Sequence, residues 1–325
     1  MDLKRELEDK LIFFNAKLES FLEGGEPEEL YDAIRHLPLA GGKRLRPILS
    51  MLSCEAVSGN VEDVLPYAIS LELIHNFTLV HDDIMDNSHL RRNIPTVHVK
   101  YGEATAILAG DLLFAKAYEA LNSLNTNIVG KLSRVLTKAI IEVCEGQKLD
   151  MDFEDRNIVS EEEYLVMIKK KTSALFRAAA EGGAIIGGGG EQEVKSLRVY
   201  GENLGLAFQI RDDYLDMSSS VETLGKDIGN DIRNGKKTLI AVYALTHTEG
   251  EDKKQLESLF GKRDASDEEV RVVYQIFRET GSLEYADKVA RKYMEDALRS
   301  IDVLEEKPVK QLLKELARFA VEREK

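Results

Sequence analysis

Apolar side chains recur every three or four positions along most of this chain, which is the spacing of amphipathic helices. The clearest stretches are Ala104 to Leu121 and Ile128 to Leu149. Alternation with a period of two, bounded by turn pairs, is scarce, so no sheet is predicted. Only six prolines interrupt the chain. The pattern therefore predicts an all-α fold.

The bounds of the predicted helices follow from where this spacing begins and ends. They are Leu3–Leu22, Pro47–Val57, Val64–Asp86, Ala104–Leu121, Ile128–Leu149, Glu161–Ile186, Glu191–Asp216 and Lys237–Thr246, with shorter helices after Asp252. The segment Ser218 to Gly235 is rich in Ser, Gly, Asn and Asp, which predicts a long polar loop and a candidate lid. The mixed charges after Leu304 predict an exposed terminal helix.

The composition is that of a folded globular protein. Of 325 residues, 43% are hydrophobic and 31% charged, and no linker divides them, so residues 1–325 are predicted to form a single domain. The net charge of −14 argues against nucleic acid as a partner. Two cysteines and a charged N-terminus predict a reduced, cytoplasmic setting. No uncharged apolar run is long enough to cross a bilayer, so stable membrane insertion is not expected.

Aspartates occur twice in the same spaced pattern, as Asp82-Asp83-Ile84-Met85-Asp86 and as Asp212-Asp213-Tyr214-Leu215-Asp216. On a helix, positions i and i+4 share a face, so the first and last carboxylates of each triad lie together. Three acids this close repel one another unless a cation neutralises their charge. Two such triads facing each other would form an oxygen-lined site for Mg²⁺, which commonly shares its coordination shell with substrate phosphates.

Basic residues stand close to these acids in the sequence. The turn Gly41 to Pro47 combines glycines, which let backbone amides approach an anion, with Lys43 and Arg46. Arg91-Arg92 begins five residues after Asp86, and this pair suits either surface ion pairs or the oxygens of a diphosphate. Further candidates in the set are His75, Lys171, Lys226 and Lys236. Together the acids and bases predict a site for two phosphorylated substrates.

These motifs, in this order, resemble the trans-type prenyl diphosphate synthases, particularly the short-chain farnesyl and geranylgeranyl branch. The matching motifs are Gly41-Gly42-Lys43-Arg44-Leu45-Arg46-Pro47, the first aspartate phrase with Arg91-Arg92, Gly146-Gln147-Lys148-Leu149-Asp150, Lys171-Thr172, Phe208-Gln209-Ile210-Arg211 before the second phrase, and Leu224-Gly225-Lys226. The resemblance implies a large antiparallel helix bundle around a deep central cavity, of the isoprenoid synthase type. It also implies a homodimer.

The resemblance implies a Mg²⁺-dependent, head-to-tail (1′-4) condensation of isopentenyl diphosphate with dimethylallyl, geranyl or farnesyl diphosphate. The product would be geranylgeranyl diphosphate, farnesyl diphosphate or both. The allylic substrate would ionise first, the isopentenyl double bond would attack the carbocation, and the departing diphosphate would take the proton. Electrostatic stabilisation of the leaving group would be the largest catalytic contribution.

Roles are carried over only onto matching positions. The metal ligands, for more than one Mg²⁺ per active site, would be Asp82, Asp83, Asp86, Asp212, Asp213 and Asp216. The allylic diphosphate would be bound by Arg91, Lys171, Thr172, Gln209, Lys226 and Lys236. The isopentenyl diphosphate would be bound by Gly42, Lys43, Arg46, His75 and Arg92. Catalysis would rest on the first triad with Lys171, Thr172 and Gln209, and Gln147 and Asp150 match a Gln-x-x-Asp element of the cavity wall.

Product length is predicted from Phe77, which lies five residues before Asp82. In the family an aromatic residue at this position forms the floor that limits the growing chain, although phenylalanine is also an ordinary core residue. The small Thr78 beside it favours a twenty-carbon product over a fifteen-carbon one. Two residues separate the aspartate pair from Asp86, where some relatives have four, and that insertion also limits length in those relatives.

Three other functions are weighed against this one. A class I terpene cyclase shares an aspartate-rich first motif, but its second metal motif is normally of the Asn/Ser/Glu type. A non-catalytic, synthase-like subunit tends to lose aspartates from one phrase, and all six are present here. A calcium-binding helical protein would not need the lysines and arginines.

Overall fold

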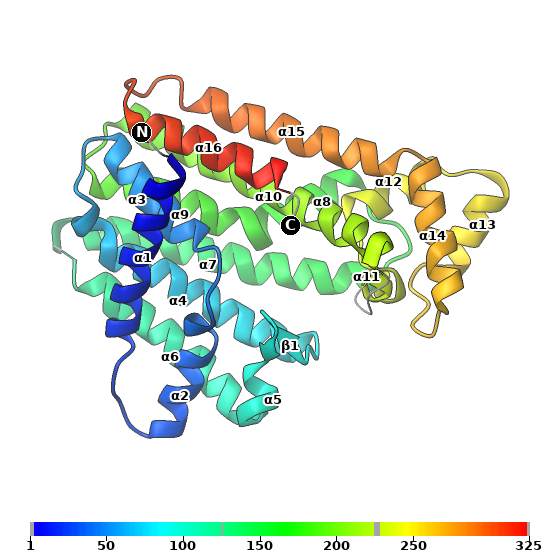
Figure 1. Cartoon of the computed structure of the whole chain (residues 1–325), viewed down its shortest axis with the longest axis horizontal. Helices are drawn as coiled ribbons and strands as arrows, with labels where there is room; N and C mark the ends of the chain where they lie inside the picture. Colours follow the sequence, from blue (N-terminus) through cyan, green and yellow to red (C-terminus); the bar gives the residue numbers. More distant parts are fainter. Residues whose placement is uncertain (1–2, 125, 224–227, 324–325) are drawn as a thin grey trace. The chain divides into compact units, whose positions relative to one another are not determined.

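The computed structural model describes residues 3–124, 126–223 and 228–323, and most of them are helical (Figure 1). The elements are α1 Leu3–Phe21, α2 Glu28–His36, η1 Pro38–Ala40, α3 Leu45–Ala56, α4 Val61–Met85, β1 Leu90–Arg91, β2 Ile94–Pro95, α5 Val97–Tyr101, α6 Glu103–Asn122, α7 Thr126–Glu154, α8 Glu161–Ile168, η2 Lys169–Ser173, α9 Ala174–Ile186, α10 Glu191–Thr223, α11 Ile228–Asn234, α12 Leu239–His247, α13 Gly250–Leu259, α14 Asp267–Glu279, α15 Ser282–Ser300 and α16 Pro308–Glu322. The two strands form one short antiparallel hairpin. The prediction of an all-α fold is confirmed.

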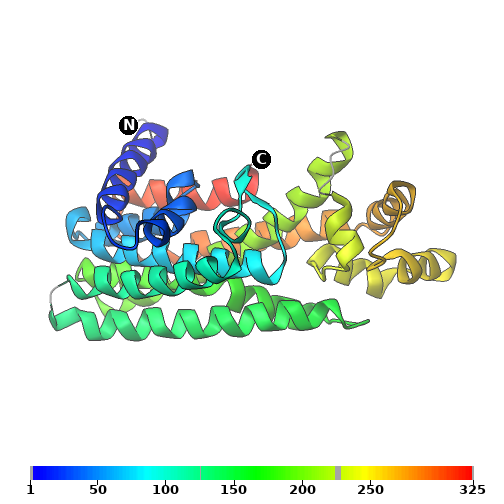
Figure 2. The same ribbon diagram turned by 90° about the horizontal axis from the view of Figure 1, so that it is seen from below.

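The chain divides into two compact units. The first comprises Met1–Ile140, Ala178–Arg198 and Val303–Leu313, and the second comprises Ile141–Arg177, Val199–Asp302 and Lys314–Lys325. The single domain expected over residues 1–325 stays a prediction. Figure 2 shows α7, at 29 residues, as the long green helix. Among the described residues, no helix combines the length and apolarity that crossing a bilayer requires.

Several helices begin at side chains that accept the first unpaired backbone N–H groups. The Asn60 side chain accepts from the Glu62 amide at 3.1 Å and starts α4. Ser160 with Glu163 forms a capping box at the start of α8, and Ser266 with Glu269 does the same for α14. Each cap stabilises its helix by about 1 kcal/mol, so these starts are encoded locally.

In the first unit, α4 packs against α3 and α6, which lie on either side of it (Figure 1). The middle of α4, from Tyr67 to Ile74, is buried on every side because its apolar residues surround the helix instead of forming one stripe. The buried Tyr67 hydroxyl donates to the Ala178 carbonyl at 2.8 Å. Gly182 makes room for that ring, because a Cβ there would lie 2.2 Å from it. This packing fixes the helix that carries the first aspartate triad.

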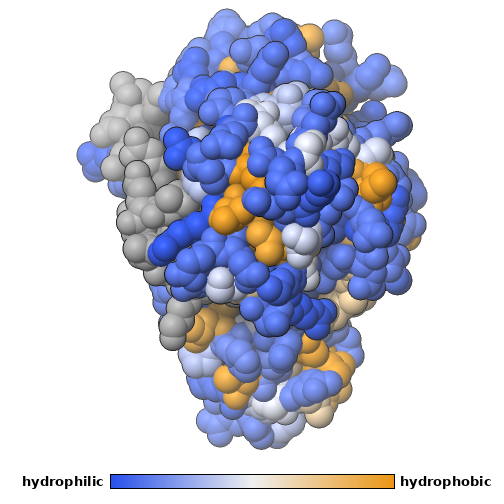
Figure 3. All heavy atoms as spheres, turned by 90° about the vertical axis from the view of Figure 1, so that its right-hand side faces the viewer, coloured by the Kyte–Doolittle hydropathy of each residue, from blue (hydrophilic) through white to orange (hydrophobic). Residues whose placement is uncertain are grey.

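In the second unit, α15 packs against α12 and α14. The centre of this packing is apolar, with Leu239, Phe277 and Ala290 all fully or almost fully buried. By contrast, the face shown in Figure 3 is mostly hydrophilic, with small separate apolar patches. Burial of this kind stabilises at roughly 25 cal/mol per Å² of apolar surface.

One predicted element is wrong, and a second, the terminal helix, is present but less exposed than predicted. Within the described residues, the predicted loop Ser218–Gly235 is largely helical, since α10 continues to Thr223 and α11 spans Ile228–Asn234, while residues 224–227 lie outside them. A helix that is already formed gains one hydrogen bond per added residue, and the sequence from Asp216 to Thr223 contains no glycine or proline. The terminal helix is not simply exposed, because Leu312, Leu316 and their apolar neighbours bury one face of α16.

Two further helices, α2 and α5, are absent from the sequence prediction because both are short. The predicted helix Glu161–Ile186 is divided by a π-helical turn, η2.

Candidate active site

The first aspartate triad lies at the C-terminal end of α4. Asp86 is the C-cap, and its amide donates to the Asp82 carbonyl at 2.8 Å. This end of a helix carries the partial negative charge of unpaired carbonyl groups. Three carboxylates added there raise the local negative charge further, so the position favours a bound cation.

Asp83 is 1% exposed, and its Oδ1 accepts from Arg91 Nε at 2.7 Å. Burial raises the pKa of Asp83, and the charge and hydrogen bond of Arg91 act in the opposite direction. The second oxygen, Oδ2, is buried without a hydrogen-bond partner among the described residues. An unsatisfied buried oxygen costs about 1–3 kcal/mol, and a hard cation would remove that cost.

The Gly41–Pro47 turn is anchored by Arg44, which the sequence prediction did not assign to the site. Arg44 is 4% exposed, and its Nη1 donates to Glu72 Oε1 at 2.5 Å. Its Nη2 donates to the Pro38 carbonyl. With Arg44 held inward, the neighbouring Lys43 is exposed and Arg46 is half-buried. The turn therefore presents the two predicted diphosphate-binding cations on either side of a structural arginine.

Arg92 occupies the tip of the hairpin between β1 and β2. Arg92 and Asn93 both have left-handed backbone conformations, with φ of 54° and 62°. This is the geometry that a two-residue hairpin turn requires. The Arg92 guanidinium donates to the carbonyls of Leu37 and Gly41, and a Cβ at Gly42 would lie 3.0 Å from it. The structure therefore brings the predicted residues Arg92 and Gly42 together.

His75 lies on α4, within the electrostatic field of four arginines. Burial lowers the pKa of His75 well below its ordinary value, and Arg46, Arg92, Arg91 and Arg44 lower it further. The imidazole is therefore neutral near pH 7, with one nitrogen that can donate a hydrogen bond and one that can accept, and it adds no charge. Four nearby cations make this region of the first unit a good site for an anionic group.

Phe77 is half-buried and belongs to a row of aromatic rings between α4 and α6. Its ring centroid lies 5.5 Å from that of Phe114 and 5.0 Å from that of His81, both edge to face. Phe114 lies 5.3 Å from Tyr118, whose hydroxyl is 2.7 Å from Thr137 Oγ1.

His81 is held in place by α6. Its Nε2 donates to the Ile107 carbonyl at 3.1 Å, and a Cβ at Gly110 would lie 2.1 Å from that nitrogen. Only glycine at position 110 therefore leaves room for the ring that precedes Asp82.

The second triad lies within α10, in the second unit. Asp213 is 4% exposed, and its two oxygens accept from Gln209 Nε2 at 2.9 Å and from the Tyr164 hydroxyl at 2.8 Å. Burial raises the pKa of Asp213 to about 6, against the charge of Lys236. Thr172 Oγ1 donates to Gln209 Oε1 at 2.7 Å, so a continuous hydrogen-bonded chain fixes the Gln209 amide.

Lys171 and Thr172 lie in the π-helical turn η2, and both neighbouring helices carry glycine where they pass it. A Cβ at Gly146 of α7 would lie 2.3 Å from the Lys171 amide nitrogen, and one at Gly205 of α10 would lie 2.6 Å from the Ser173 Cα. The two glycines therefore let three backbones approach closely. Single π-helical turns are often found at functional sites.

Two lysines of the predicted set lie near acids in this unit. Lys171 Nζ is 2.5 Å from Asp150 Oδ2, and Lys236 Nζ is 3.7 Å from Asp231 and 3.9 Å from Asp213. Burial alone would lower the pKa of Lys236, but these acids outweigh it and raise the pKa.

The second unit gathers several predicted residues around one narrow cavity of about 40 Å³. Its lining includes Asp150, Tyr164, Lys171, Thr172, Gln209, Asp213 and Lys236. Tyr164 was missed by the sequence prediction because a tyrosine in a helical pattern is most simply a core residue. The predicted Lys226 lies outside the described residues. Gln147 Oε1 is buried without a hydrogen-bond partner in the part of the chain that the structure describes.

The chemistry of the donor set fits Mg²⁺. All six proposed ligands are carboxylates, the hard oxygen donors that Mg²⁺ prefers, and Asp83 Oδ2 has no other partner among the described residues. Within those residues no three acidic, imidazole or thiol groups are already gathered as a metal site. Mg²⁺ usually keeps waters and substrate phosphates in its shell and does not need a complete protein cage.

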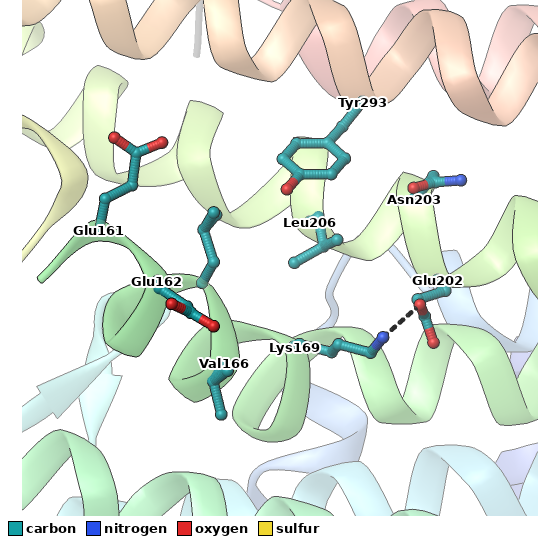
Figure 4. A pocket seen from close by; sticks show the side chains of 9 residues that line it. Glu161, Glu162, Val166, Lys169, Glu202, Asn203, Leu206 and Tyr293 are labelled. Atoms are coloured by element: carbon teal, nitrogen blue, oxygen red, sulfur yellow. Dashed lines mark ion pairs between the residues drawn. The ribbon is translucent and has the colours of Figure 1, made fainter.

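A wider cavity of about 530 Å³ lies elsewhere in the second unit, between α8, α10 and α15 (Figure 4). Its lining includes Glu161, Glu162, Glu202 and Tyr293, and Lys169 Nζ is 2.6 Å from Glu202. None of the predicted site residues lines it. The predicted residues of this unit therefore gather at the narrow cavity and not at the wider one.

Several known proteins are similar to this chain over almost its whole length. The family model described as polyprenyl synthetase matches residues 27–277. Geranylgeranyl diphosphate synthase of Methanosarcina mazei is 45% identical over 100% of this chain and 99% of its own. The crystal structure of geranylgeranyl pyrophosphate synthetase from Pyrococcus horikoshii Ot3 matches with a TM-score of 0.93 and 41% identity, covering 99% of this chain and 98% of that one.

A polyprenyl synthase from Caulobacter crescentus CB15, complexed with calcium and isoprenyl diphosphate, matches with a TM-score of 0.91 and 32% identity, covering 99% of this chain and 97% of that one.

Proposed function

The chain belongs to the polyprenyl synthetase family, and on that premise we propose that it condenses isopentenyl diphosphate with allylic diphosphates to give geranylgeranyl diphosphate. Farnesyl diphosphate would be an intermediate or co-product. The observation that carries the proposal is the pairing of each aspartate triad with lysines or arginines inside its own unit. A calcium-binding helical protein would have no use for those cations.

In the first unit, the isopentenyl diphosphate would be bound by Lys43, Arg46 and Arg92, with the neutral His75 and the Gly42 backbone beside them. Arginine forks match the oxygens of a diphosphate in a bidentate manner, and Lys43 adds a positive charge. The left-handed backbone at Arg92 is a conformation that costs about 1 kcal/mol or more, which the hairpin and the guanidinium contacts offset.

The allylic diphosphate would be bound by Arg91, Lys171 and Lys236, with the six aspartates of the two triads holding more than one Mg²⁺. When bound, Mg²⁺ supplies positive charge that stabilises the diphosphate as the allylic C–O bond breaks. Thr172 and Gln209, fixed by their mutual hydrogen bond, would orient the reacting carbon. The isopentenyl double bond then forms the new C–C bond, and the proton lost from the adduct goes to the departing diphosphate.

Product length would be set by the aromatic row that begins at Phe77. The ring lies on the same helix as Asp82, five positions before it, and is only half-buried. A prenyl chain growing away from the metals along α4 would meet Phe77 and then Phe114. The twenty-carbon product is favoured because Thr78, next to Phe77, is small.

We further propose a homodimer, which sedimentation would detect at twice the chain mass of 36.5 kDa. A single 36.5-kDa species at micromolar concentration would contradict it. The cytoplasmic location stays a prediction.

The test is to incubate the purified chain with Mg²⁺, isopentenyl diphosphate and each allylic primer separately, and to identify products by mass spectrometry. We expect a twenty-carbon diphosphate from every primer. A cyclase would release a hydrocarbon without isopentenyl diphosphate, and a non-catalytic subunit would form nothing. Asp82→Ala should lower turnover by about 100-fold or more, because one electrostatic contact in the transition state contributes that much, while its melting temperature stays close to that of the parent.

A further inference from the structure

Arg323, directly after α16, contacts the first aspartate of the second triad. Its Nη2 donates to Asp212 Oδ1 at 2.6 Å. The Arg323 side chain is 1% exposed, whereas that of Asp212 is 43% exposed. The guanidinium therefore approaches the carboxylate from the protein side, and the rest of the carboxylate faces solvent.

Three further contacts hold Arg323 against α10. Its guanidinium carbon lies 4.1 Å from the centroid of the Phe208 ring, and its Nη2 is 3.4 Å from the Phe208 carbonyl. The Arg323 carbonyl in turn accepts from Arg211 Nη2 at 3.2 Å, and Arg211 Nη1 donates to Asp287 at 3.0 Å. A planar guanidinium that is stacked on a ring and hydrogen-bonded through Nη2, on a residue whose backbone carbonyl is also held, has little freedom to turn.

In this arrangement, part of the Arg323 guanidinium makes no hydrogen bond to the part of the chain that the structure describes. Arg323 Nε and Nη1 are buried without hydrogen-bond partners among the described residues. Each such group costs about 1–3 kcal/mol. The contact with Asp212 and the stacking on Phe208 must therefore outweigh that cost.

We propose that Arg323 is a positioning residue that fixes the Asp212 carboxylate in the orientation that binds Mg²⁺. One oxygen is held by the guanidinium, so the other is directed outward instead of rotating freely. The positive charge also offsets the repulsion between Asp212 and Asp216, which lie one helical turn apart. The inference rests on the proposed function only in taking Asp212 as a ligand. Hydrogen-bonding partners of metal ligands typically contribute 10–100-fold to metal affinity.

The test measures Mn²⁺ binding, as a spectroscopic probe for Mg²⁺, by the electron paramagnetic resonance signal of the free ion. The parent carries Asp82→Asn and Asp86→Asn, so that binding reports the second triad. Adding Arg323→Gln should weaken Mn²⁺ binding about tenfold. Arg318→Gln is the matched control: Arg318 lies on α16, five positions before Arg323, and pairs with Glu315 at the surface, at 2.5 Å, so binding should not change.

Arg323→Lys separates orientation from charge. It keeps the positive charge but loses the planar fork and should bind Mn²⁺ as weakly as Arg323→Gln. Recovery of binding by lysine would overturn the orienting role in favour of charge alone. If Arg323→Gln binds Mn²⁺ as tightly as the parent or more tightly, the inference is overturned outright, since the arginine would then have no effect on binding or would compete with the metal. Circular dichroism confirms that each variant is folded.

Failure of this inference is distinguishable from failure of the proposed function, because no prenyl substrate enters the binding measurement. If the wild-type chain makes the twenty-carbon product and Arg323→Gln binds Mn²⁺ normally, only the inference fails. If the wild-type chain makes no product, the proposed function fails whatever the binding result.

Discussion

At the scale of single residues, each charged group of the site takes its properties from its neighbours. Asp83 and Asp213 are both buried aspartates, yet one meets an arginine and the other a tyrosine and a glutamine. His75 is neutral near pH 7 because burial and four nearby arginines lower its pKa. The surroundings of these residues could not be predicted from their positions in the sequence, because they depend on which side chains the fold brings within a few ångströms.

His75 gives a pH-dependent contribution to stability. Because its folded pKa lies well below the unfolded value of about 6.5, the unfolded chain binds the extra proton. Stability is therefore fully present above about pH 6.5 and falls as the pH drops below it, by up to about 1.4 kcal/mol per pH unit. Urea unfolding should show wild type losing about 1 kcal/mol more than His75→Gln between pH 6.5 and 5.5. An equal loss of unfolding free energy in wild type and His75→Gln would refute this. His247→Gln, at an exposed position, is the control and should lose as much as wild type.

At the scale of elements, the spacing of apolar residues locates most helices, whereas the fine geometry of the site depends on small residues where helices touch. The π-helical turn at Lys171 is possible because Gly146 and Gly205 let neighbouring backbones approach. The row from Phe77 to Tyr118 likewise exists because α4 and α6 pack side by side. Both features connect helix packing directly to the chemistry of the site.

Gly146→Ala should displace the turn that carries Lys171 and Thr172. A Cβ 2.3 Å from the Lys171 nitrogen must be relieved by backbone movement, so we expect a loss of about 1–3 kcal/mol in the free energy of unfolding. Turnover should fall about 100-fold, since misplacement by about 1 Å costs that much. Gly130→Ala on the same helix is the control, because its Cβ meets nothing closer than 4.0 Å, and stability there should hold or rise by up to about 1 kcal/mol. Equal turnover of the two variants would contradict the role given to this turn.

Phe77→Ser should lengthen the product, because it removes the first ring that the growing chain meets. Products beyond twenty carbons are expected by mass spectrometry, and adding Phe114→Ala should lengthen them further. Phe319→Ser, at an exposed position on α16, is the control and should leave the distribution unchanged. An unaltered distribution in Phe77→Ser would return Phe77 to the role of an ordinary packing residue.

At the scale of the whole molecule, the two aspartate triads belong to different compact units of the chain. The proposed function nevertheless requires both triads to serve one diphosphate through Mg²⁺. A ligand that binds only the folded state stabilises it by about 2.7 kcal/mol when its concentration is a hundred times Kd. Binding is therefore visible in thermal unfolding without any turnover.

Inorganic pyrophosphate with Mg²⁺ should raise the melting temperature of the wild-type chain by several degrees. Asp82→Asn and Asp212→Asn should each lose most of that rise, because each removes one triad from the shared ligand. Pyrophosphate without Mg²⁺, in the presence of a chelator, is the control. A full rise in either variant would show that a single triad suffices.

The sequence by itself determined the all-α class, the positions of most helices and the family, because helical periodicity and the order of the aspartate and basic motifs are local properties of the chain. Only the tertiary structure revealed Tyr164 and Arg323, which lie 49 and 111 positions from the aspartates they contact. It likewise showed that Arg44, inside a predicted substrate-binding motif, is an internal anchor of that turn. The physical reason is that periodicity reports which face of a helix is buried, whereas a buried hydrogen bond is made by whichever distant side chain the packing delivers.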